Sequence, residues 1–380
     1  MLGLRQDAAP HAGLMDAPRT VQQVTEAVER VLGDVLDTGL RRAHEIDPVY
    51  ARDVVARVTA FVRRGGKRLR TAFVWSGWRA AGGSADATAV LAVGAALELL
   101  QACALVHDDV MDGSSLRRGG PAMHVDFAHQ HRADGMDGAP ESFADSAAVL
   151  AGDLALAWAD DLLTEAALGS PHGVRLHSEW RAMRGEMVAG QYRDLHAQAT
   201  GARGLDEAVT IATLKSALYT VERPLALGAS LAGADARTLD ALRSAGRCAG
   251  LAFQLRDDLL GAFGDPLLTG KPADDDLRTR KLTYLLAVAL TLADASGDVD
   301  ATAVLAPAAE PRSDATVERM RLALERTGAR AMVEAKIDEL AAKSLRYFGE
   351  SGASPEAQGE FAALVERASG PAPQRRGAAR

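Results

Sequence analysis

The sequence predicts an all-α protein, and three observations support this fold class. Nearly every segment between residues 21 and 368 places apolar residues at the three- and four-residue spacing of a helix. No run of alternating Val, Ile or Thr is bounded by hairpin signals, so strands are not expected. The apolar content, 48% of the 380 residues, comes mainly from Ala, Leu and Val, with 4% aromatic residues. This mixture favours helices packed closely against helices.

The predicted helices differ in how they are expected to pack. Residues 21–36 alternate an apolar stripe with Glu and Arg, as in a helix at the surface of a bundle. Residues 88–106 are apolar nearly all round, which indicates a central helix surrounded by others. The remaining clear helical patterns cover residues 146–168, 210–233, 238–260 and 281–296.

The breaks between these patterns do not separate halves of different composition. We therefore predict one large domain over residues 21–368. Flexible tails are expected at 1–20 and 369–380, where Pro and Gly occur without apolar periodicity. An insert at 132–145 is expected to form an exposed loop.

Composition also narrows the function and the compartment. The net charge of −8 argues against a nucleic-acid partner. The two cysteines, Cys103 and Cys248, lie in apolar runs and fit buried thiols in a reducing cytoplasm. The first twenty residues have no apolar centre, so no signal peptide is expected. The apolar stretch 87–106 contains Glu98 and Gln101, which favours a core helix over a membrane span. We expect a cytoplasmic protein without stable membrane association.

The stretch "ALVHDDVMDGSSLRRGG", residues 104–120, ends an apolar helical run with crowded acids. Asp108 and Asp112 are four residues apart and share one helix face, whereas Asp109 points about a quarter-turn away. Carboxylates this close repel one another unless a cation lies between them. Oxygen ligands of this kind suit Mg²⁺.

A second acidic pair and two basic segments extend this chemistry. Asp257 and Asp258 close another apolar run, and a glycine-rich segment with Lys271 and then Lys281 follows. Upstream, "RRGGKRLR" at 63–70 brings five basic residues together. Acidic segments that alternate with Lys and Arg are typical of a site that binds a metal ion together with a phosphate group. Two phosphate-bearing substrates would explain the number of cationic positions, one held through Mg²⁺ and one by Lys and Arg alone.

Four motifs in this order and spacing carry a family resemblance: "GGKRLR", "LVHDDVMDGSSLRRGGPAMH", "LKSALYTVERPLALG" and "FQLRDDLLGAFGDPLLTGKP". Over about residues 20–365, the chain resembles the trans-type isoprenyl diphosphate synthases, also called polyprenyl synthetases. The resemblance implies a helical bundle around a deep central cavity, usually as a homodimer. It also implies Mg²⁺-assisted head-to-tail condensation of isopentenyl diphosphate with an allylic diphosphate (dimethylallyl, geranyl or farnesyl), releasing diphosphate.

The resemblance also implies roles for individual residues. Catalytic roles fall on Asp108, Asp109, Asp112, Arg117, Lys215, Asp257, Asp258 and Lys271. The substrate-binding residues are Lys67, Arg70, Gln101, Arg117, Arg118, Lys215, Ser216, Gln254, Lys271 and Lys281. The metal ligands are Asp108, Asp112 and Asp257, with three Mg²⁺ ions expected per site when substrate is bound.

This sequence departs from the family pattern in three places. The second acidic motif has Gly261 where the family has a third acid, although "DDD" at 274–276 restores charge nearby. Thr71 stands where a Pro is common, and Ser216 stands where a Thr is common.

Product length is predicted from the residues that precede the first motif. If the reacting end lies at Asp108 and Asp112, the hydrocarbon tail runs back along the helix past Ala104 and Cys103, then Leu100. The two small residues leave this path open, which predicts a product longer than C15, with geranylgeranyl diphosphate (C20) favoured. The alternative interpretation is that small residues merely allow close helix packing.

Three rival functions remain at this point. A metal-dependent phosphohydrolase would use the His107-Asp108 pair but would want further His ligands, and His44, His124, His177 and His196 show no compelling pattern. A class I terpene cyclase would not need Lys67, Arg70 and Arg118. A non-catalytic partner subunit would have eroded acids, whereas the first motif is complete.

Overall fold

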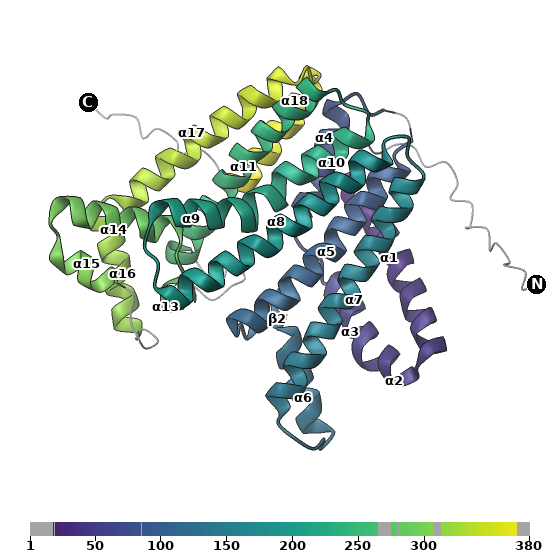
Figure 1. Ribbon diagram of the computed structural model, residues 1–380, viewed down its shortest axis with the longest axis horizontal. Coiled ribbons are helices and arrows are strands. Elements are labelled where there is room, and N and C mark those ends of the chain that lie inside the picture. Colours follow the sequence, from purple (N-terminus) through teal and green to yellow (C-terminus); the bar gives the residue numbers. More distant parts are fainter. Residues whose placement is uncertain are drawn as a thin grey trace, which may run out of the picture.

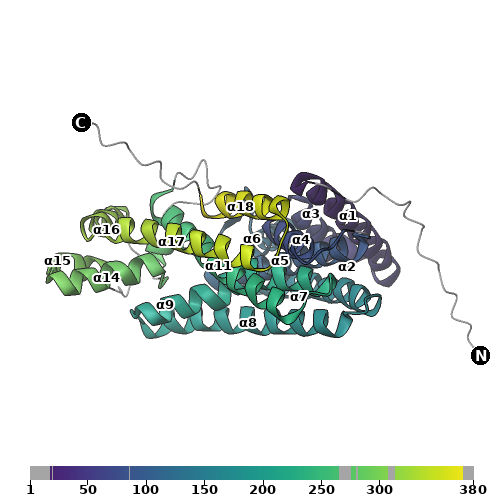
Figure 2. The same ribbon diagram turned by 90° about the horizontal axis from the view of Figure 1, so that it is seen from above.

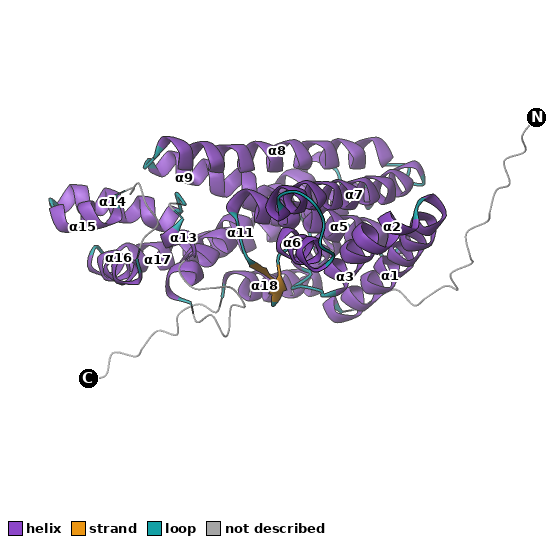
Figure 3. Cartoon of the chain, turned by 90° about the horizontal axis from the view of Figure 1, so that it is seen from below, coloured by secondary structure: helices purple, strands orange, loops and turns teal. Residues whose placement is uncertain are grey.

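The structure is a computed structural model that describes residues 18, 20–84, 86–264, 275–279, 281–306 and 313–370. The described chain is almost entirely helical, which confirms the predicted fold class (Figure 1, Figure 3). The expected tails at 1–20 and 369–380 lie almost wholly outside the described residues, so their flexibility stays a prediction.

The helices divide between the two halves of the chain. The first half contains α1 (Val21–Ile46), α2 (Pro48–Tyr50), the π-helix η1 (Ala51–Val55), α3 (Ala56–Arg63), α4 (Leu69–Ala80), α5 (Thr88–Asp112), α6 (Met123–Ala133), α7 (Pro140–Leu168) and α8 (Gly173–Thr200). The second half contains α9 (Leu205–Ile211), the π-helix η2 (Ala212–Glu222), α10 (Arg223–Leu231), α11 (Ala236–Phe263), α13 (Asp275–Arg278), α14 (Tyr284–Ser296), α15 (Val299–Leu305), α16 (Asp314–Arg326), α17 (Ala329–Glu350) and α18 (Pro355–Ser369).

Polar residues set where several of these helices begin. Asp235 accepts a hydrogen bond from the backbone N–H of Thr238 at the start of α11, and Thr283 accepts one from Leu286 at the start of α14. Such N-caps satisfy backbone donors that have no partner within the helix. The helix α11 carries Asp257 and Asp258, and Lys281 lies just before α14, so the starting points of the two capped helices help to place the candidate site.

The helix α5 lies at the centre of the first half of the bundle. Its apolar residues belong to one buried cluster with residues of α1, α4, α7 and α8. In the second view α8 runs along one face and α17 and α18 along the opposite face, with α5 and α11 between them (Figure 2). By length and composition α5 could also cross a membrane, as many core helices of soluble proteins could. Here 72% of its most apolar window is buried inside the protein.

Two further buried clusters build the second half. One joins α11 with α13 to α17, and the other joins α4, α10, α11, α17 and α18. The helix α11 therefore contributes to both, and its carboxyl-terminal end carries the second acidic pair. Close packing on α11 leaves little freedom for where those acids point.

Two expectations about local structure need correction. Strands were not expected, but Leu116–Arg117 (β1) pairs antiparallel with Gly120–Pro121 (β2) around the turn at Arg118 and Gly119. Both turn residues have positive φ, as a two-residue hairpin turn requires. The expected loop at 132–145 is shorter than predicted, because α6 continues to Ala133 and α7 starts at Pro140. Proline fits the first turn of a helix, where its missing N–H is not needed.

Two arginines adopt a backbone conformation that L-residues avoid. Among the described residues, Arg68 and Arg118 are the non-glycine positions with positive φ, at 48° and 52°. Such a conformation costs about 1–2 kcal/mol per residue. Both arginines belong to the basic segments singled out from the sequence, so the strain lies where backbone geometry matters for the candidate site.

The π-helix η2 lies against α8 through one glycine. A Cβ atom on Gly190 would lie 2.3 Å from the backbone nitrogen of Lys215 and 2.7 Å from the carbonyl carbon of Leu214. Only a residue without a side chain allows two helices to approach this closely. Gly190 therefore determines how near η2, and with it Lys215, comes to α8.

We expect Gly190→Ala to destabilise the protein by about 1–3 kcal/mol, because the added methyl group meets backbone atoms that can only move together with η2. The free energy of unfolding, measured with denaturant, tests this expectation. Gly185→Ala is the matched control, because Gly185 lies on the exposed side of the same helix with nothing within 4 Å of its Cβ position. The control should be neutral or up to about 1 kcal/mol more stable. Equal stability of the two variants would show that the α8–η2 contact is not tight.

Candidate active site

The first acidic motif lies at the carboxyl-terminal end of α5, and two of its carboxylates, Asp108 and Asp112, are each paired to a lysine. Lys215 Nζ, on η2, donates to Asp108 Oδ1 at 3.0 Å. Lys281 Nζ, just before α14, donates to Asp112 Oδ2 at 2.7 Å. A helix carboxyl terminus is the unfavourable end for acids, so these acids depend on cations brought in from the second half of the chain.

A buried carboxylate that sequence analysis missed completes the surroundings of Lys215. Asp194, on α8, is 4% exposed, and its Oδ2 accepts a hydrogen bond from Lys215 Nζ at 2.7 Å. Lys215 thus bridges Asp108 and Asp194. In the sequence Asp194 is a single acid in the middle of a polar helix and has no motif around it. Its role follows only from the packing of α8 on η2.

At Asp108, Lys215 and Lys281, pairing with opposite charges shifts the pKa more than burial does, and in the opposite direction. Burial disfavours charge on Asp108, but Lys215 and Lys281 hold its pKa below the ordinary value for aspartate. Burial also disfavours charge on both lysines, yet Asp108 raises the pKa of Lys215, and Asp276, Asp112 and Asp108 raise that of Lys281. Asp108 and both lysines are therefore ionised at neutral pH. We call Asp108, Asp112, Lys215, Lys281 and the Arg117 described next the acidic site.

Asp109 holds an arginine in place instead of facing the lysines. It is fully buried, and its Oδ1 accepts hydrogen bonds from Arg117, including one from Nε at 2.8 Å. Arg117 Nη2 also lies 3.6 Å from Asp108 Oδ2. Burial raises the pKa of Asp109, although Arg117 opposes this. This contact directs Arg117 from the β1–β2 hairpin toward the first acidic motif.

In the second acidic motif the two aspartates have different surroundings. Asp257 is half-buried, whereas Asp258 is buried and both of its oxygens accept hydrogen bonds. Gln254 Nε2 donates to Asp258 Oδ1 at 2.8 Å and the backbone nitrogen of Tyr284 donates to Oδ2 at 3.0 Å. Burial raises the pKa of Asp258 to about 7, with Asp276 and Asp257 adding to the effect. Asp258 therefore joins α11 to the start of α14 and holds the side chain of Gln254.

A second group of cations lies near Arg118, around the strained segments. Arg118 Nη1 donates to the carbonyl oxygen of Phe61 at 3.1 Å, and its guanidinium lies 5.0 Å from the centre of the Phe61 ring. Burial, together with the positive charges of Arg68, Arg70 and Arg117, lowers the pKa of Arg118 to about 10, although Glu98 opposes them. The positive charges of the arginines around Arg118 are thus not fully balanced by the negative charge of Glu98. Such a place favours an anion.

Arg70 and Gln101 belong to the same group and share one aromatic partner. The guanidinium of Arg70 lies 4.2 Å from the centre of the Tyr219 ring, and its Nη2 donates to Thr220 Oγ1 at 3.0 Å. The hydroxyl of Tyr219 donates to Gln101 Oε1 at 2.8 Å. Arg70 Nε is buried without a hydrogen-bond partner among the described residues. We call Arg70, Arg118 and Gln101 the arginine site.

Tyr219 and Thr220 lie in the motif "LKSALYTVERPLALG", but their contacts with Gln101 and Arg70 could not be inferred from the sequence. Both lie on η2, as does Lys215, which belongs to the acidic site. A π-helix has more residues per turn than an α-helix, so positions five apart, such as Lys215 and Thr220, come closer to the same face. One helix therefore supports both sites.

Arg68 has a structural role that separates it from its basic neighbours. Its side chain is 2% exposed and lies 2.7 Å from Glu98 of α5 and 2.7 Å from Glu29 of α1. Thr71 donates to the same Glu98 at 3.2 Å, which gives its hydroxyl a structural role. These buried contacts anchor the start of α4, from which Arg70 reaches the arginine site.

Three predicted substrate-binding residues gain less support from the structure. Lys67 is exposed in the segment before α4, next to Gly66, whose Cβ position lies 3.4 Å from Arg118 Nη2. Ser216 is half-buried on η2 beside Lys215. Lys271 lies outside the described residues, so its role stays a prediction.

The residues expected to control product length do not all face the same way. Ala104 is half-buried one turn before Asp108, whereas Cys103 and Leu100 are buried. Cys103 Sγ lies 3.7 Å from Nδ1 of His107, whose Nε2 contacts the carbonyl oxygen of Val149 on α7 at 3.1 Å. His107 thus packs between α5 and α7. Of the three predicted residues, Ala104 retains the most access to the helix face that carries Asp108.

The acidic site fits Mg²⁺ by the chemistry of its donors. The available ligands are carboxylate oxygens, which Mg²⁺ prefers when waters and substrate phosphates complete its shell. In the described ranges no three His, Cys, Asp or Glu side chains gather closely enough to enclose a metal ion. The two carboxylates of the acidic site, Asp108 and Asp112, instead lie one turn apart on α5, each paired with a lysine. This arrangement suits a metal that arrives together with an anion able to take over those lysines.

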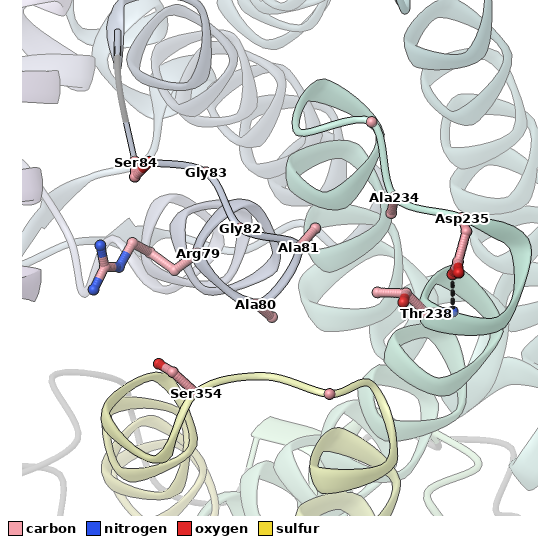
Figure 4. Close-up of a pocket in the computed structure, with 12 residues that line it drawn as sticks. Arg79, Ala80, Ala81, Gly82, Gly83, Ser84, Ala234, Asp235, Thr238 and Ser354 are labelled. Carbon is pink, nitrogen blue, oxygen red and sulfur yellow. Dashed lines mark hydrogen bonds between the residues drawn. The ribbon is translucent and has the colours of Figure 1, made fainter.

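A pocket of about 590 Å³ lies apart from these residues (Figure 4). It is lined by the loops between α4 and α5, α10 and α11, and α17 and α18. It therefore adjoins the amino-terminal end of α5, and the aspartates lie at the other end of this 25-residue helix, about 37 Å away. Asp235 in the pocket is engaged in capping α11, and Arg79 pairs with Glu356 at 3.4 Å.

Comparison with known proteins gives a consistent result. Residues 53–321 match the polyprenyl synthetase family. The geranylgeranyl diphosphate synthase of Mycobacterium tuberculosis is 32% identical over 292 residues, which cover 77% of each chain. The (2E,6E)-farnesyl diphosphate synthase of the same organism is 37% identical over 219 residues, 57% of this chain. That match spans about half (55%) of the relative's length.

A solved structure resembles the whole described bundle. The geranylgeranyl pyrophosphate synthase from Corynebacterium glutamicum, complexed with isoprenyl diphosphate and magnesium, superposes with a TM-score of 0.88. It is 38% identical in sequence, and the match covers 93% of this chain and 99% of that chain.

Proposed function

This chain belongs to the polyprenyl synthetase family, and we propose that it is a Mg²⁺-dependent prenyltransferase that condenses isopentenyl diphosphate with an allylic diphosphate. One observation carries the proposal: the acidic site and the arginine site are distinct, yet both are supported by η2. One site suits a diphosphate with metal, and the other suits a diphosphate without metal. The reaction needs one of each.

In this proposal the acidic site holds the allylic diphosphate and the metal. Asp108, Asp112 and Asp257 hold Mg²⁺, and we infer three ions when substrate is bound. The metal's chemistry there is to neutralise charge on the departing diphosphate. The diphosphate-binding residues are Arg117, Lys215, Ser216, Gln254, Lys271 and Lys281. The short ion pairs of Lys215 and Lys281 support this role, because both ammonium groups are charged and already lie beside the carboxylates.

The arginine site holds isopentenyl diphosphate through Lys67, Arg70, Gln101 and Arg118. Its buried and incompletely balanced positive charge supports this role, because a bound diphosphate would supply the missing negative charge. Tyr219 and Thr220 act as positioning residues here, since they fix Gln101 and Arg70 by hydrogen bonds.

The reaction follows from these placements. Cations around the allylic diphosphate stabilise its negative charge as the C–O bond breaks and the electron pair leaves with oxygen. The double bond of isopentenyl diphosphate, held nearby, then attacks the allylic cation, and a new C–C bond forms. A proton leaves the resulting cation and passes to the released diphosphate. The apolar faces of α5 and its neighbours exclude water, which would otherwise capture the cation.

In this proposal, product length depends on the residues that lie one and two turns before Asp108 on the same face of α5. Related enzymes are named for farnesyl as well as geranylgeranyl products, so similarity alone does not choose between C15 and C20. Ala104 is small and half-buried on that face, and it leaves room for a hydrocarbon tail. We propose geranylgeranyl diphosphate (C20) as the product.

We further propose a cytoplasmic homodimer. The exposed side of α7 carries apolar residues, with Leu150 62% and Val149 42% exposed, and a second copy of the chain could cover them. Both cysteines are free, as expected in a reducing compartment.

The purified chain, supplied with Mg²⁺, isopentenyl diphosphate and each allylic primer in turn, should form a C20 diphosphate detectable by chromatography. Removal of divalent metal with a chelator should abolish product, because the leaving group loses its neutralising charge. A clean stop at C15 would contradict the predicted length. Diphosphate release without a longer product would favour the phosphohydrolase, and a cyclised hydrocarbon would favour the terpene cyclase.

We expect Ala104→Phe to shorten the main product from C20 to C15 or less, because the phenyl ring would fill the space one turn below Asp108. Ala104→Ser, which keeps a small side chain, is the control and should leave the product unchanged. The product distribution from farnesyl and geranyl primers measures the effect. An unaltered distribution in the Phe variant would show that another part of the cavity limits the chain.

A further inference from the structure

We propose that Asp276 supplies the carboxylate that the second acidic motif lacks at Gly261. This inference rests on the proposed function, because it assigns a residue to the metal side of the acidic site. An ideal Cβ atom on Gly261 would lie 2.7 Å from Asp276 Oδ2 and 3.6 Å from its Cγ. The Asp276 carboxylate therefore occupies the space into which a side chain at position 261 would project.

The contact between Gly261 and Asp276 lies close to the second acidic motif, because Gly261 is on the same helix, α11. Gly261 is one turn after Asp257, so the two positions share a helix face. An acid at 261 would stand beside Asp257. Asp276, on α13, packs against α11 and brings its carboxylate to that place from a different segment of the chain.

The surroundings of Asp258 make a replacement acid useful. Both oxygens of Asp258 accept hydrogen bonds from the protein, from Gln254 and from the backbone of Tyr284. Asp258 is therefore held by contacts within the protein, and an acid brought in by α13 adds a second carboxylate oxygen donor beside Asp257, of the kind that Mg²⁺ prefers.

The position of the Asp276 carboxylate requires glycine at position 261, which lowers the intrinsic stability of α11. Glycine within a helix is about 1 kcal/mol less favourable than alanine. Here any side chain would displace the Asp276 carboxylate, so the glycine has a packing reason. Within the run of three aspartates at 274–276, the structure brings the carboxylate of Asp276 to α11; Asp274 and the side chain of Asp275 lie outside the described part of the chain.

The test moves the carboxylate from one position to the other. Mg²⁺ binding is measured by calorimetry in the presence of inorganic diphosphate, for wild type, Asp276→Ala, the double variant Gly261→Asp/Asp276→Ala and Asp300→Ala. Asp300 is an exposed acid on α15 and controls for the loss of one charge. Thermal unfolding without metal establishes that each variant is folded.

We expect Asp276→Ala to weaken Mg²⁺ binding about 10–100-fold. The double variant should recover most of the loss, because the deleted carboxylate frees the space for an acid on α11. Asp300→Ala should match wild type. The inference is overturned if Asp276→Ala binds Mg²⁺ like Asp300→Ala, or if the folded double variant stays as weak as the single variant. Because no isopentenyl diphosphate is used, failure of this inference and failure of prenyl transfer are separate results.

Discussion

The ion pairs between the first acidic motif and two distant lysines are the interaction on which the site depends. Asp108 and Asp112 end an apolar helix whose dipole disfavours acids, and burial adds a desolvation cost. Lys215 and Lys281 offset both effects at distances of 3.0 and 2.7 Å. Since the lysines come from η2 and from the segment before α14, the same contacts tie the two halves of the chain together around the acidic site. Without them the end of α5 would hold unbalanced charge.

These pairs also suggest how the resting site becomes a substrate site. Before substrate arrives, each carboxylate has a lysine as its partner. In the proposed function, Asp108 and Asp112 would hold Mg²⁺, and Lys215 and Lys281 would turn to the phosphate oxygens of a bound diphosphate. The tight contact of η2 with α8 at Gly190 keeps Lys215 within reach in either state.

The fold class and the charged motifs could be predicted because their signals are local. Helical periodicity in a nearly strand-free sequence indicated the bundle, and the spacing of Asp108 and Asp112 indicated one shared face. The two-residue strands around Arg118 were missed because hydrophobic alternation cannot show in so short a hairpin. Asp194, Tyr219 and Thr220 were missed for a different reason. Their roles arise from contacts between segments far apart in sequence, and the π-helical geometry of η2 is not visible in residue spacing.

The central claim is that Mg²⁺ and diphosphate enter the acidic site together, because the carboxylates are otherwise engaged by lysines. Calorimetric titration of the purified chain with Mg²⁺, in the absence and in the presence of saturating inorganic diphosphate, tests this claim most directly. We expect diphosphate to tighten Mg²⁺ binding at least about tenfold, equivalent to about 1.4 kcal/mol of coupling. Equal Mg²⁺ affinity under the two conditions would contradict it.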